Sequence, residues 1–486
     1  MGPRFTYLGH ASWHVRWPGG ALVTDPILSE TYHDGVFEVF PRRTIDADRL
    51  DLTDLVITHR HPDHFDVPTL AVLARRFPNA RVWTSDALIV EAATELGFRQ
   101  VERIGPLQVV DLGGGLRCCT SPSLCPVEEW GVLFQTEEGT VWNLVDSAVR
   151  SPAHVEQMLA AMAEHLETPA LKAGPDVAIV RWCPLRQADA ATSGTLGFPH
   201  EAYANEVRNA AATGARTLIP GSCGDRYFGR AAWQNATVYP TTEARFLADL
   251  AVLAPDAERF APVVGQAWDL VAGRFVSRGP VDWVVRDDSV ADDRTFAPFQ
   301  LPAIEDPLTY PENAAQLAAF DADLALVRIA TWCGDTLAPA LGRWVARHLP
   351  EAASAPLVLV LEVVFPRTST PETDRGTIGL TFHVRGPEVS VAVGTDPDHD
   401  ALERLTASDL LAVLDGRAHW GAALLGGRMR SVRRGGRLRA DGSYAALPLP
   451  AFLVYTALPY DRATERWVRN LVSRLKHSSE CVDEQR

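Results

Sequence analysis

Three histidines and one aspartate crowd into six consecutive positions of the chain. His59, His61, Asp63 and His64 follow the apolar segment 55–58, which is typical of a buried strand. Open sheets place their sites at strand ends, so a loop there can turn all four side chains toward one point. Imidazoles and carboxylates bind zinc, iron and manganese, and two ligands set apart from two others suit a pair of metals. With 14 histidines in 486 residues, we favour a metal site over a solvated loop with histidines at random.

Short strands alternating with helices must position this loop. The apolar patterns predict a mixed α/β layered sandwich, in which strands are buried between helices. The predicted strands are 5–8, 12–17, 21–25, 55–58, 81–84, 101–104, 109–112, 130–135, 140–145, 177–180 and 217–219, with a helix over 68–76.

The composition changes after Gly279. An acid-rich stretch over 282–293 leads into predicted helices at 314–325 and 336–348. Alternating apolar residues then predict a two-stranded meander over 378–393.

A last helical part closes the chain. Ser408 is expected to cap one helix, and a final helix is expected over 461–475. We therefore predict four parts: a catalytic domain, a helical linker region, a smaller α+β domain and a disordered tail, at 1–280, 281–354, 355–475 and 476–486.

Charge and composition exclude several classes of protein. The 46 Lys and Arg against 61 Asp and Glu give a net charge of −15, so binding to nucleic acid is not expected. The seven cysteines form no CxxC pair, and neither a disulfide framework nor a structural zinc site is indicated. No apolar segment reaches the roughly 18 residues of a membrane span, and no signal peptide is evident. A cytoplasmic protein is expected.

The motif H-x-H-x-D-H after a buried strand resembles the signature of the metallo-β-lactamase fold superfamily. Segments 7–12 (YLGHAS) and 24–28 (TDPIL) look like the branch with the ascorbate-phosphate lactonase-like and N-acyl-phosphatidylethanolamine phospholipase-like proteins. The resemblance covers about residues 4–275. It implies an αββα sandwich with a dinuclear site at one edge of its sheets.

The resemblance also implies roles for individual residues. His59 and His61 would hold one metal, and Asp63 and His64 the other. Asp146, after the predicted strand 140–145, matches the carboxylate that bridges both ions; its alternative role is to cap a turn. His10 would lie near the metals as a supporting or catalytic group beside Asp63; a buried histidine bonded to backbone is the alternative.

Two departures from the zinc hydrolases of this superfamily alter the expected chemistry. Neither segment 120–130 nor segment 218–225 contains the histidine expected there. Both segments look more like the catalytic half of CMP-N-acetylneuraminate hydroxylase-like proteins, whose Rieske half has no counterpart here. Glu129 is the preferred extra ligand, and Glu128 is its neighbour; a solvated acidic turn is the alternative. Such mixed oxygen and nitrogen ligation suits iron and oxygen chemistry.

Four other residues are candidates to replace the missing histidines. Asp225 would supply oxygen, His200 nitrogen, and Cys125 or Cys223 a thiolate that favours zinc. The alternatives are a helix cap for His200 and buried free thiols for the cysteines.

The C-terminal third resembles the sterol-carrier-protein-2 fold over about residues 355–450. The likeness rests on segments 381–384, 408–411 and 422–429. It implies an apolar cleft for a lipid or acyl chain, and the alternative is a small domain that packs on the first or mediates dimerisation.

The leading hypothesis is an oxidoreductase, a non-haem diiron monooxygenase that uses O₂ and an external electron donor to hydroxylate an apolar, natural-product or lipid-like substrate. The second hypothesis is a hydrolase, in which two zinc ions activate water to attack an ester, amide or phosphodiester. The third is a non-catalytic lipid-binding protein. The oligomeric state is left open.

Overall fold

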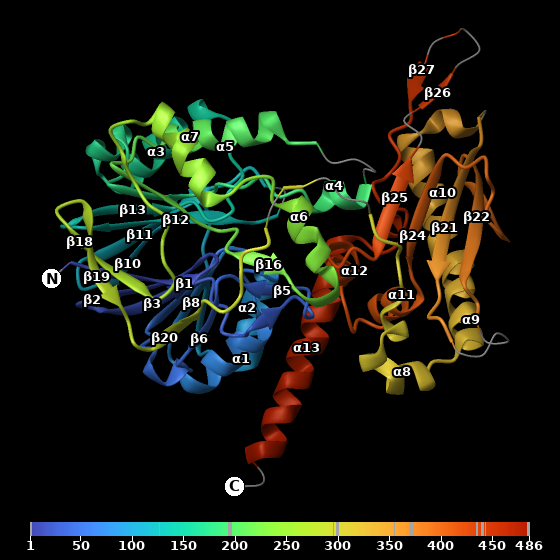
Figure 1. Cartoon of the computed structure of the whole chain (residues 1–486), viewed down its shortest axis with the longest axis horizontal. Coiled ribbons are helices and arrows are strands. Elements are labelled where there is room, and N and C mark those ends of the chain that lie inside the picture. Colours follow the sequence, from blue (N-terminus) through green and yellow to red (C-terminus); the bar gives the residue numbers. More distant parts are fainter. Residues whose placement is uncertain are drawn as a thin grey trace. The chain divides into compact units, whose positions relative to one another are not determined.

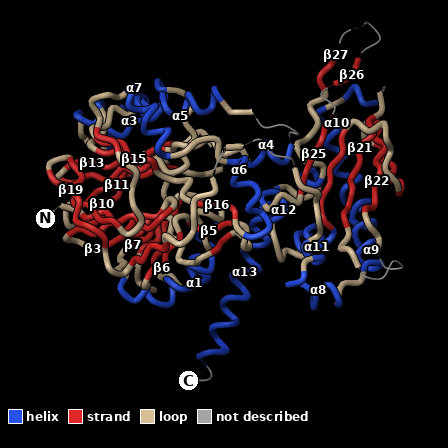
Figure 2. The backbone as a smooth tube through the Cα atoms, in the orientation of Figure 1, coloured by secondary structure: helices blue, strands red, loops and turns tan. Residues whose placement is uncertain are grey.

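The computed structural model describes residues 2–483, except 126, 193–196, 295, 298–300, 354, 369–373, 434–435, 439–441 and 443. Its chain divides into two compact units, and Figure 2 shows strands and helices in each. The first unit comprises Met1–Arg186, Gly197–Pro298 and Leu471–Arg486, and the second comprises Gln187–Leu196 and Phe299–Asn470.

The first unit contains an eight-stranded sheet that is antiparallel on one side and parallel on the other. In spatial order its strands are β19 (Arg274–Pro280), β18 (Gln266–Val271), β1 (Arg4–Gly9), β2 (Ser12–Trp17), β3 (Gly20–Thr24), β7 (Asp54–Ile57), β8 (Arg81–Thr84) and β9 (Gln100–Arg103).

A second, seven-stranded sheet repeats this division into antiparallel and parallel parts. Its strands are β10 (Val109–Gly113), β11 (Leu116–Pro122), β12 (Trp130–Thr136), β13 (Gly139–Asn143), β14 (Val177–Val180), β15 (Thr217–Pro220) and β17 (Glu258–Arg259). Two small sheets complete the unit: β16 (Asp225–Tyr227), β5 (Phe37–Val39) and β4 (Thr31–Tyr32), and β20 (Val284–Asp287) with β6 (Arg42–Ile45).

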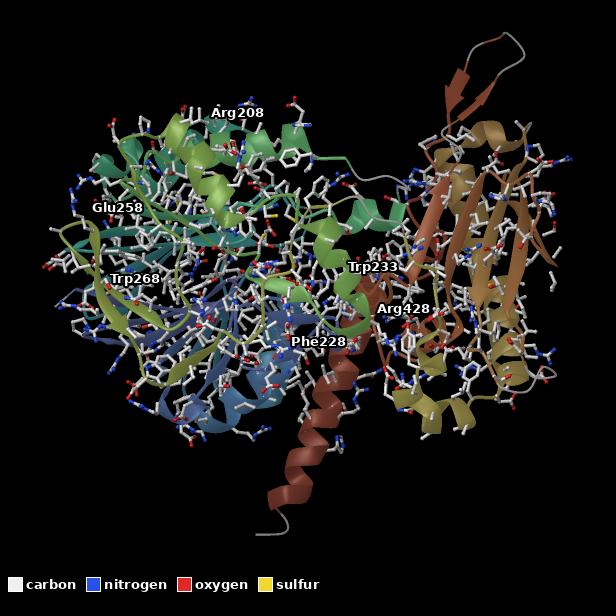
Figure 3. The ribbon with its side chains drawn as sticks, viewed as in Figure 1. Arg208, Phe228, Trp233, Glu258, Trp268 and Arg428 are labelled. Atoms are coloured by element: carbon white, nitrogen blue, oxygen red, sulfur yellow. The ribbon has the colours of Figure 1, made fainter. Side chains whose placement is uncertain are left out.

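The two large sheets pack face to face through aromatic side chains. Phe5 of β1 meets Phe134 of β12 edge to face, with ring centroids 5.9 Å apart. At the outer strands, Trp268 of β18, labelled in Figure 3, stacks on Phe275 of β19. Aromatic pairs of this kind contribute about 0.5–1.5 kcal/mol beyond the area they bury. The alternating apolar strands thus form the core that the sequence indicates.

Helices cover the outer faces of both sheets, so the expected αββα layering is present in this unit (Figure 1). Helices α1 (Val67–Arg76) and α2 (Ala87–Leu96) lie against the first sheet, and α3 (Pro152–His165), α5 (His200–Ala212) and α7 (Glu243–Leu253) form the opposite layer. Shorter turns of helix are η1 (Ala47–Arg49), η2 (Pro169–Ala173), η3 (Gly229–Gln234) and α6 (Asn235–Val238).

The second unit is built on a five-stranded sheet of order β23-β22-β21-β24-β25. These strands are β23 (Glu388–Val393), β22 (Thr377–Arg385), β21 (Leu357–Val364), β24 (Ala401–Thr406) and β25 (Met429–Arg433), and β26 (Gly436–Leu438) pairs with β27 (Tyr444–Ala446).

Several helices join this sheet in a separate apolar core, to which α9, α10, α11 and α12 contribute side chains. The helical elements of the second unit are α4 (Gln187–Thr192), η4 (Pro307–Thr309), η5 (Pro311–Asn313), α8 (Ala314–Ala318), α9 (Ala322–Trp332), the π-helical turn η6 (Cys333–Leu337), α10 (Ala338–His348), η7 (Pro350–Ala353), α11 (Ala407–Leu414), α12 (Trp420–Leu425), η8 (Val454–Thr456) and the part of α13 (Tyr460–Asp483) up to Asn470.

Residues 281–354 do not form the separate linker region that we expected. Strand β20 pairs with β6 and belongs to the first unit. Helices α9 and α10 instead bury Ile329 and Leu341 in the core of the second unit. The acid-rich composition gave no sign of strand β20, because that strand exposes every side chain except Val284.

Two helix ends also differ from expectation. Thr406, rather than Ser408, caps α11, since its side chain accepts a hydrogen bond from the Asp409 amide. Helix α13 continues to Asp483, so residues 476–483 of the expected disordered tail are helical, and 484–486 lie outside the described residues. Among the described helices, none combines the length and the apolar character that crossing a membrane requires.

Candidate metal centre

The HRHPDH loop begins at the carboxyl end of β7 and is anchored to the neighbouring parallel strand. Thr58 donates its amide and its hydroxyl to the two carboxylate oxygens of Asp25, each over 2.8 Å. Asp25 directly follows β3 and has a positive φ of 40°, a conformation that its fully buried side chain sustains through these bonds. The loop therefore leaves the sheet in a fixed direction.

His64 lies at the centre of the site. Its Nδ1 is 2.9 Å from Oδ2 of Asp25, and its Nε2 is 3.3 Å from Oδ2 of Asp63 and 3.5 Å from Oδ2 of Asp146. Although burial favours the neutral ring, these carboxylates raise the pKa of His64 well above its usual value. The carboxylates around His64 thus strongly favour a positive charge beside them.

A first group of candidate ligands consists of His10, Asp63 and His64, whose donor atoms lie within 4.8 Å of one another. His10 follows β1 with a φ of 51°, and its Nε2 lies 3.4 Å from Oδ2 of Asp63. Burial opposes ionisation of Asp63, but the two imidazoles lower the pKa of its carboxyl well below the usual value. His10 therefore lies close enough to Asp63 and His64 to share a metal ion with them.

A second group, His59, His64 and Asp146, meets the same distance limit. Thr58 Oγ1 lies 3.0 Å from Nδ1 of His59, and Nε2 of His59 lies 2.8 Å from Nδ1 of His61. Burial and the two neighbouring imidazoles lower the pKa of His59 well below its usual value, so it presents the neutral ring that a metal requires. His61 adjoins this group through His59.

Asp146 reaches the site from the second sheet. It follows β13, and Arg181 donates to its backbone oxygen over 3.2 Å. Burial works against its charge, yet His64 and Arg181 lower the pKa of its carboxyl far below the usual value. The side chains of Asp63 and Asp146 are 28% and 31% exposed. Solvent and small molecules therefore reach the carboxylate side of the cluster.

Glu129 lies next to this cluster but outside both groups. Its Oε1 accepts hydrogen bonds from Ser123 Oγ and, over 3.0 Å, from the Ala148 amide. Burial and the charge of Asp146 raise its pKa, while His61 acts in the opposite direction. Glu128, in contrast, pairs with Arg103 and is half exposed, so the structure separates the roles of the two glutamates.

The other candidates for the missing histidines lie outside both groups. Asp225 accepts hydrogen bonds from Tyr32 over 3.1 Å and Tyr239 over 3.2 Å. Cys223 is a buried thiol whose Sγ lies 3.7 Å from the Cys183 oxygen. Cys125 is half buried. His200 is exposed and begins α5, with Pro199 at the capping position.

Sequence reasoning missed the residues that orient the cluster. Asp25 and Thr58 were visible as part of a family-like motif and as a strand end, but nothing local indicated that they bond to each other. The signal would have been the parallel pairing of β3 with β7, because it brings the two strand ends together.

The residues present fit a metal centre. Both ring nitrogens of His10 and Nε2 of His64 are buried and make no hydrogen bond within the described structure, although buried polar atoms are nearly always satisfied. These nitrogens without a hydrogen-bond partner lie near carboxylates, whose negative charge favours a bound cation. The His and Asp groups are consistent with a dinuclear centre, and their geometry does not identify the metal.

The N-terminal part of the chain is similar to the metallo-β-lactamase superfamily. Residues 4–116 match the family described as the beta-lactamase superfamily domain. That match stops well before residues 355–450 and gives no support to a sterol-carrier-like domain there.

Individual proteins also resemble part of the chain. A UPF0173 metal-dependent hydrolase from Aeropyrum pernix is 27% identical over an alignment of 162 residues, and the match covers 30% of this chain and 62% of that relative's length. Igni18, a metallo hydrolase from Ignicoccus hospitalis, is 16% identical, with a TM-score of 0.35 over 57% of this chain and 98% of its own. CmlA, a diiron beta-hydroxylase from Streptomyces venezuelae, is 19% identical, with a TM-score of 0.37 over 57% of this chain and 54% of its own.

Proposed function

We propose that the first unit is a non-haem diiron monooxygenase, which uses O₂ and an external electron donor to hydroxylate an apolar organic substrate. The observation that carries this proposal is the position of Glu129. Its buried carboxylate accepts a hydrogen bond from the Ala148 amide, two residues after Asp146, in the segment where a zinc hydrolase of this fold would place a histidine. A donor set rich in carboxylates favours iron over a closed zinc site.

In this proposal each iron has its own ligands. His59 and His61 would hold one metal, Asp63 and His64 would hold the other, and Asp146 and Glu129 would supply further carboxylate oxygens. Two bound irons would supply the electron transfers that O₂ activation requires. Asp25 and Thr58 keep His64 and His59 oriented, because their hydrogen bonds occupy the Nδ1 atoms and leave Nε2 facing the cluster.

Asp63 and His10 have a further, catalytic part in the proposal. Nε2 of His10 and Oδ2 of Asp63 are 3.4 Å apart, so a proton can be held between them at the exposed side of the cluster. Residues placed in this way supply or accept protons as the substrate reacts.

A zinc-dependent hydrolase is the second candidate, and the A. pernix relative favours it, since that protein carries the name of a metal-dependent hydrolase. In this case the same ligands would hold zinc, and the substrate would be an ester, amide or phosphodiester. A non-catalytic lipid-binding protein is less well supported, because the HRHPDH run and Asp146 are intact.

For residues 355–450 we retain the sterol-carrier-like proposal, in which the domain holds an acyl or lipid-like substrate. Its support is the sequence likeness of segments 381–384, 408–411 and 422–429. Binding of a fluorescent fatty acid to the full-length protein tests it, and no binding would leave only a packing or dimerising role.

The metal content of protein purified without added metal tests the main proposal. We expect about two irons per chain, an optical absorption that changes on reduction and on exposure to air, and O₂ uptake in the presence of a reductant. A Glu129→Gln variant should retain less iron. Zinc alone, with no response to O₂, would replace the monooxygenase with the hydrolase, and a protein without metal would leave the binding protein.

A further inference from the structure

A pocket of about 480 Å³ adjoins the candidate metal centre in the first unit. It is formed where β8, β9 and β11 end and where β12 begins, so the two large sheets both contribute to it. Ile104, Pro106 and Val127 provide apolar surface, and Arg103 and Glu128 provide charge. This volume is within the usual range for small-molecule sites.

Glu129 connects the pocket with the metal cluster. It lines the pocket, and it is close enough to Asp146 and His61 for their charges to affect its pKa. Ser85 forms a second link, because its hydroxyl lies 3.0 Å from the Thr58 oxygen, just before His59, and 2.6 Å from the Glu128 oxygen. A molecule in the pocket would therefore lie next to the proposed ligands.

Arg103 is the one cationic residue among those that line the pocket. Its Nε donates to the Ser85 backbone oxygen over 2.8 Å, and its Nη2 donates to Oε1 of Glu128. The bond to Ser85 fixes the plane of the guanidinium. A planar fork held in this way is organised in advance to pair with a carboxylate.

We propose that this pocket binds the substrate through a carboxylate that pairs with Arg103 in place of Glu128. The apolar body of the substrate then lies along Ile104, Pro106 and Val127, toward Glu129. The ligand class is an amphiphilic monocarboxylate, such as an aryl- or acyl-substituted acid. The assignment of this ligand as the substrate rests on the proposed function, whereas its binding to the pocket does not.

An anion fits this pocket better than an amine for three reasons. Glu129 is held by Ser123 and Ala148, which both donate to its Oε1. Glu128 is 54% exposed, so its side chain can turn into solvent when a ligand takes its place. Arg103, in contrast, keeps its anchor on Ser85 whichever carboxylate it binds.

Binding of three isosteric probes to the full-length protein tests the proposal. The probes are 4-phenylbutyrate, 4-phenylbutanamide and 4-phenylbutylamine, and ligand-detected NMR titration gives their Kd. We expect the carboxylate to bind at least about five times more tightly than the amide, as befits a half-exposed ion pair. Arg103→Gln should remove this preference, and Arg103→Lys should retain part of it. Glu128→Gln should tighten carboxylate binding, because it removes the competing charge.

Arg99→Gln is the matched control, since Arg99 is an exposed arginine just before β9 that bonds to Asn79 instead. Its Kd values should equal those of the wild type. Equal binding of carboxylate and amide, a preference for the amine, or no carboxylate binding at millimolar concentration would overturn the proposal. Metal content measured on the same samples separates the two proposals: zinc with a carboxylate preference rejects only the monooxygenase, and iron without the preference rejects only the pocket.

Discussion

Nδ1 of His64 lies 2.9 Å from Oδ2 of Asp25, a residue 39 positions earlier in the chain. This hydrogen bond fixes the tautomer of His64 and leaves its Nε2 to face Asp63 and Asp146. Carboxylates that orient a ligating histidine in this way also increase its basicity. Asp25 is therefore a positioning residue of the proposed centre, although it contributes no ligand.

Asp25→Asn should weaken metal binding without unfolding the protein. The amide has one acceptor oxygen, so it can keep one of the two Thr58 hydrogen bonds, and it provides no negative charge beside His64. We expect the affinity for one of two metals to fall by about tenfold to a hundredfold, measured by competition with a chelator. Asp51→Asn, at an exposed carboxylate paired with Arg16, is the control. Equal affinities for the two variants would show that Asp25 only anchors the loop.

Glu129→Gln and Glu128→Gln form a matched pair of neighbouring substitutions. Glu129 lies beside the metal cluster, whereas Glu128 pairs with Arg103 at the pocket. We expect Glu129→Gln to lower iron affinity by about tenfold, in the range found for altered metal-site residues. Glu128→Gln should keep the iron content of the wild type. Elemental analysis after dialysis measures both, and iron loss from both variants alike would contradict a ligand role for Glu129.

Gly224 supports His10 through close backbone packing. A Cβ atom at Gly224 would lie 2.6 Å from the Cα of His10 and 2.9 Å from the hydroxyl of Tyr7. Since backbone cannot yield as a side chain does, Gly224→Ala should destabilise the first unit by about 1–3 kcal/mol and should reduce metal retention. Gly197→Ala, where a Cβ meets nothing within 4 Å, is the control. Thermal unfolding and metal content of both variants check this.

The sequence was sufficient for the parts of the site that are local. The HRHPDH segment, the strand before it and the layered α/β fold follow from residue types and short-range periodicity. These features depend on neighbouring residues in the chain and not on the order in which the strands pair. The order of the strands was not accessible in the same way. The position of β18 beside β1 depends on pairing between residues more than 250 positions apart.

The orientation of the ligands also depends on long-range contacts. Asp25 meets His64, and Arg294 donates to the backbone oxygens of Cys223 and Asp225 over 3.1 and 3.2 Å. The residues around Arg294 looked like a linker, since a hydrophilic segment and a buried ion-pair network have similar compositions. Such networks become visible only when the fold brings their members together.

The last prediction concerns the second unit and the buried acid Glu403. Burial raises its pKa from 4.5 to about 8, opposed by the backbone amides of Leu453 and Val454. Its titratable neighbours are Tyr455 and Cys333, whose pKa values are also raised by burial, so neither ionises between pH 5 and about 8. Glu403 is thus the member of this cluster that titrates near neutral pH.

Between pH 4.5 and about 8 the folded state keeps a proton on Glu403 that the unfolded state has lost. Its stability must therefore fall as pH rises through this window, by on the order of 4 kcal/mol in total. Glu403→Gln keeps an acceptor for the Leu453 amide but cannot ionise. Its Tm should be close to that of the wild type near pH 5 and should exceed it increasingly up to pH 8.5.

Asp306 shows why the comparison must be made between variants. Burial raises its pKa to about 6, so it contributes the same sign of pH dependence to both proteins and cancels in their difference. Glu388→Gln, at an exposed position on the edge strand β23, controls for the loss of one charge. A Tm difference between Glu403→Gln and wild type that stays constant from pH 5 to about 8.5 would show that Glu403 is already ionised in the folded protein.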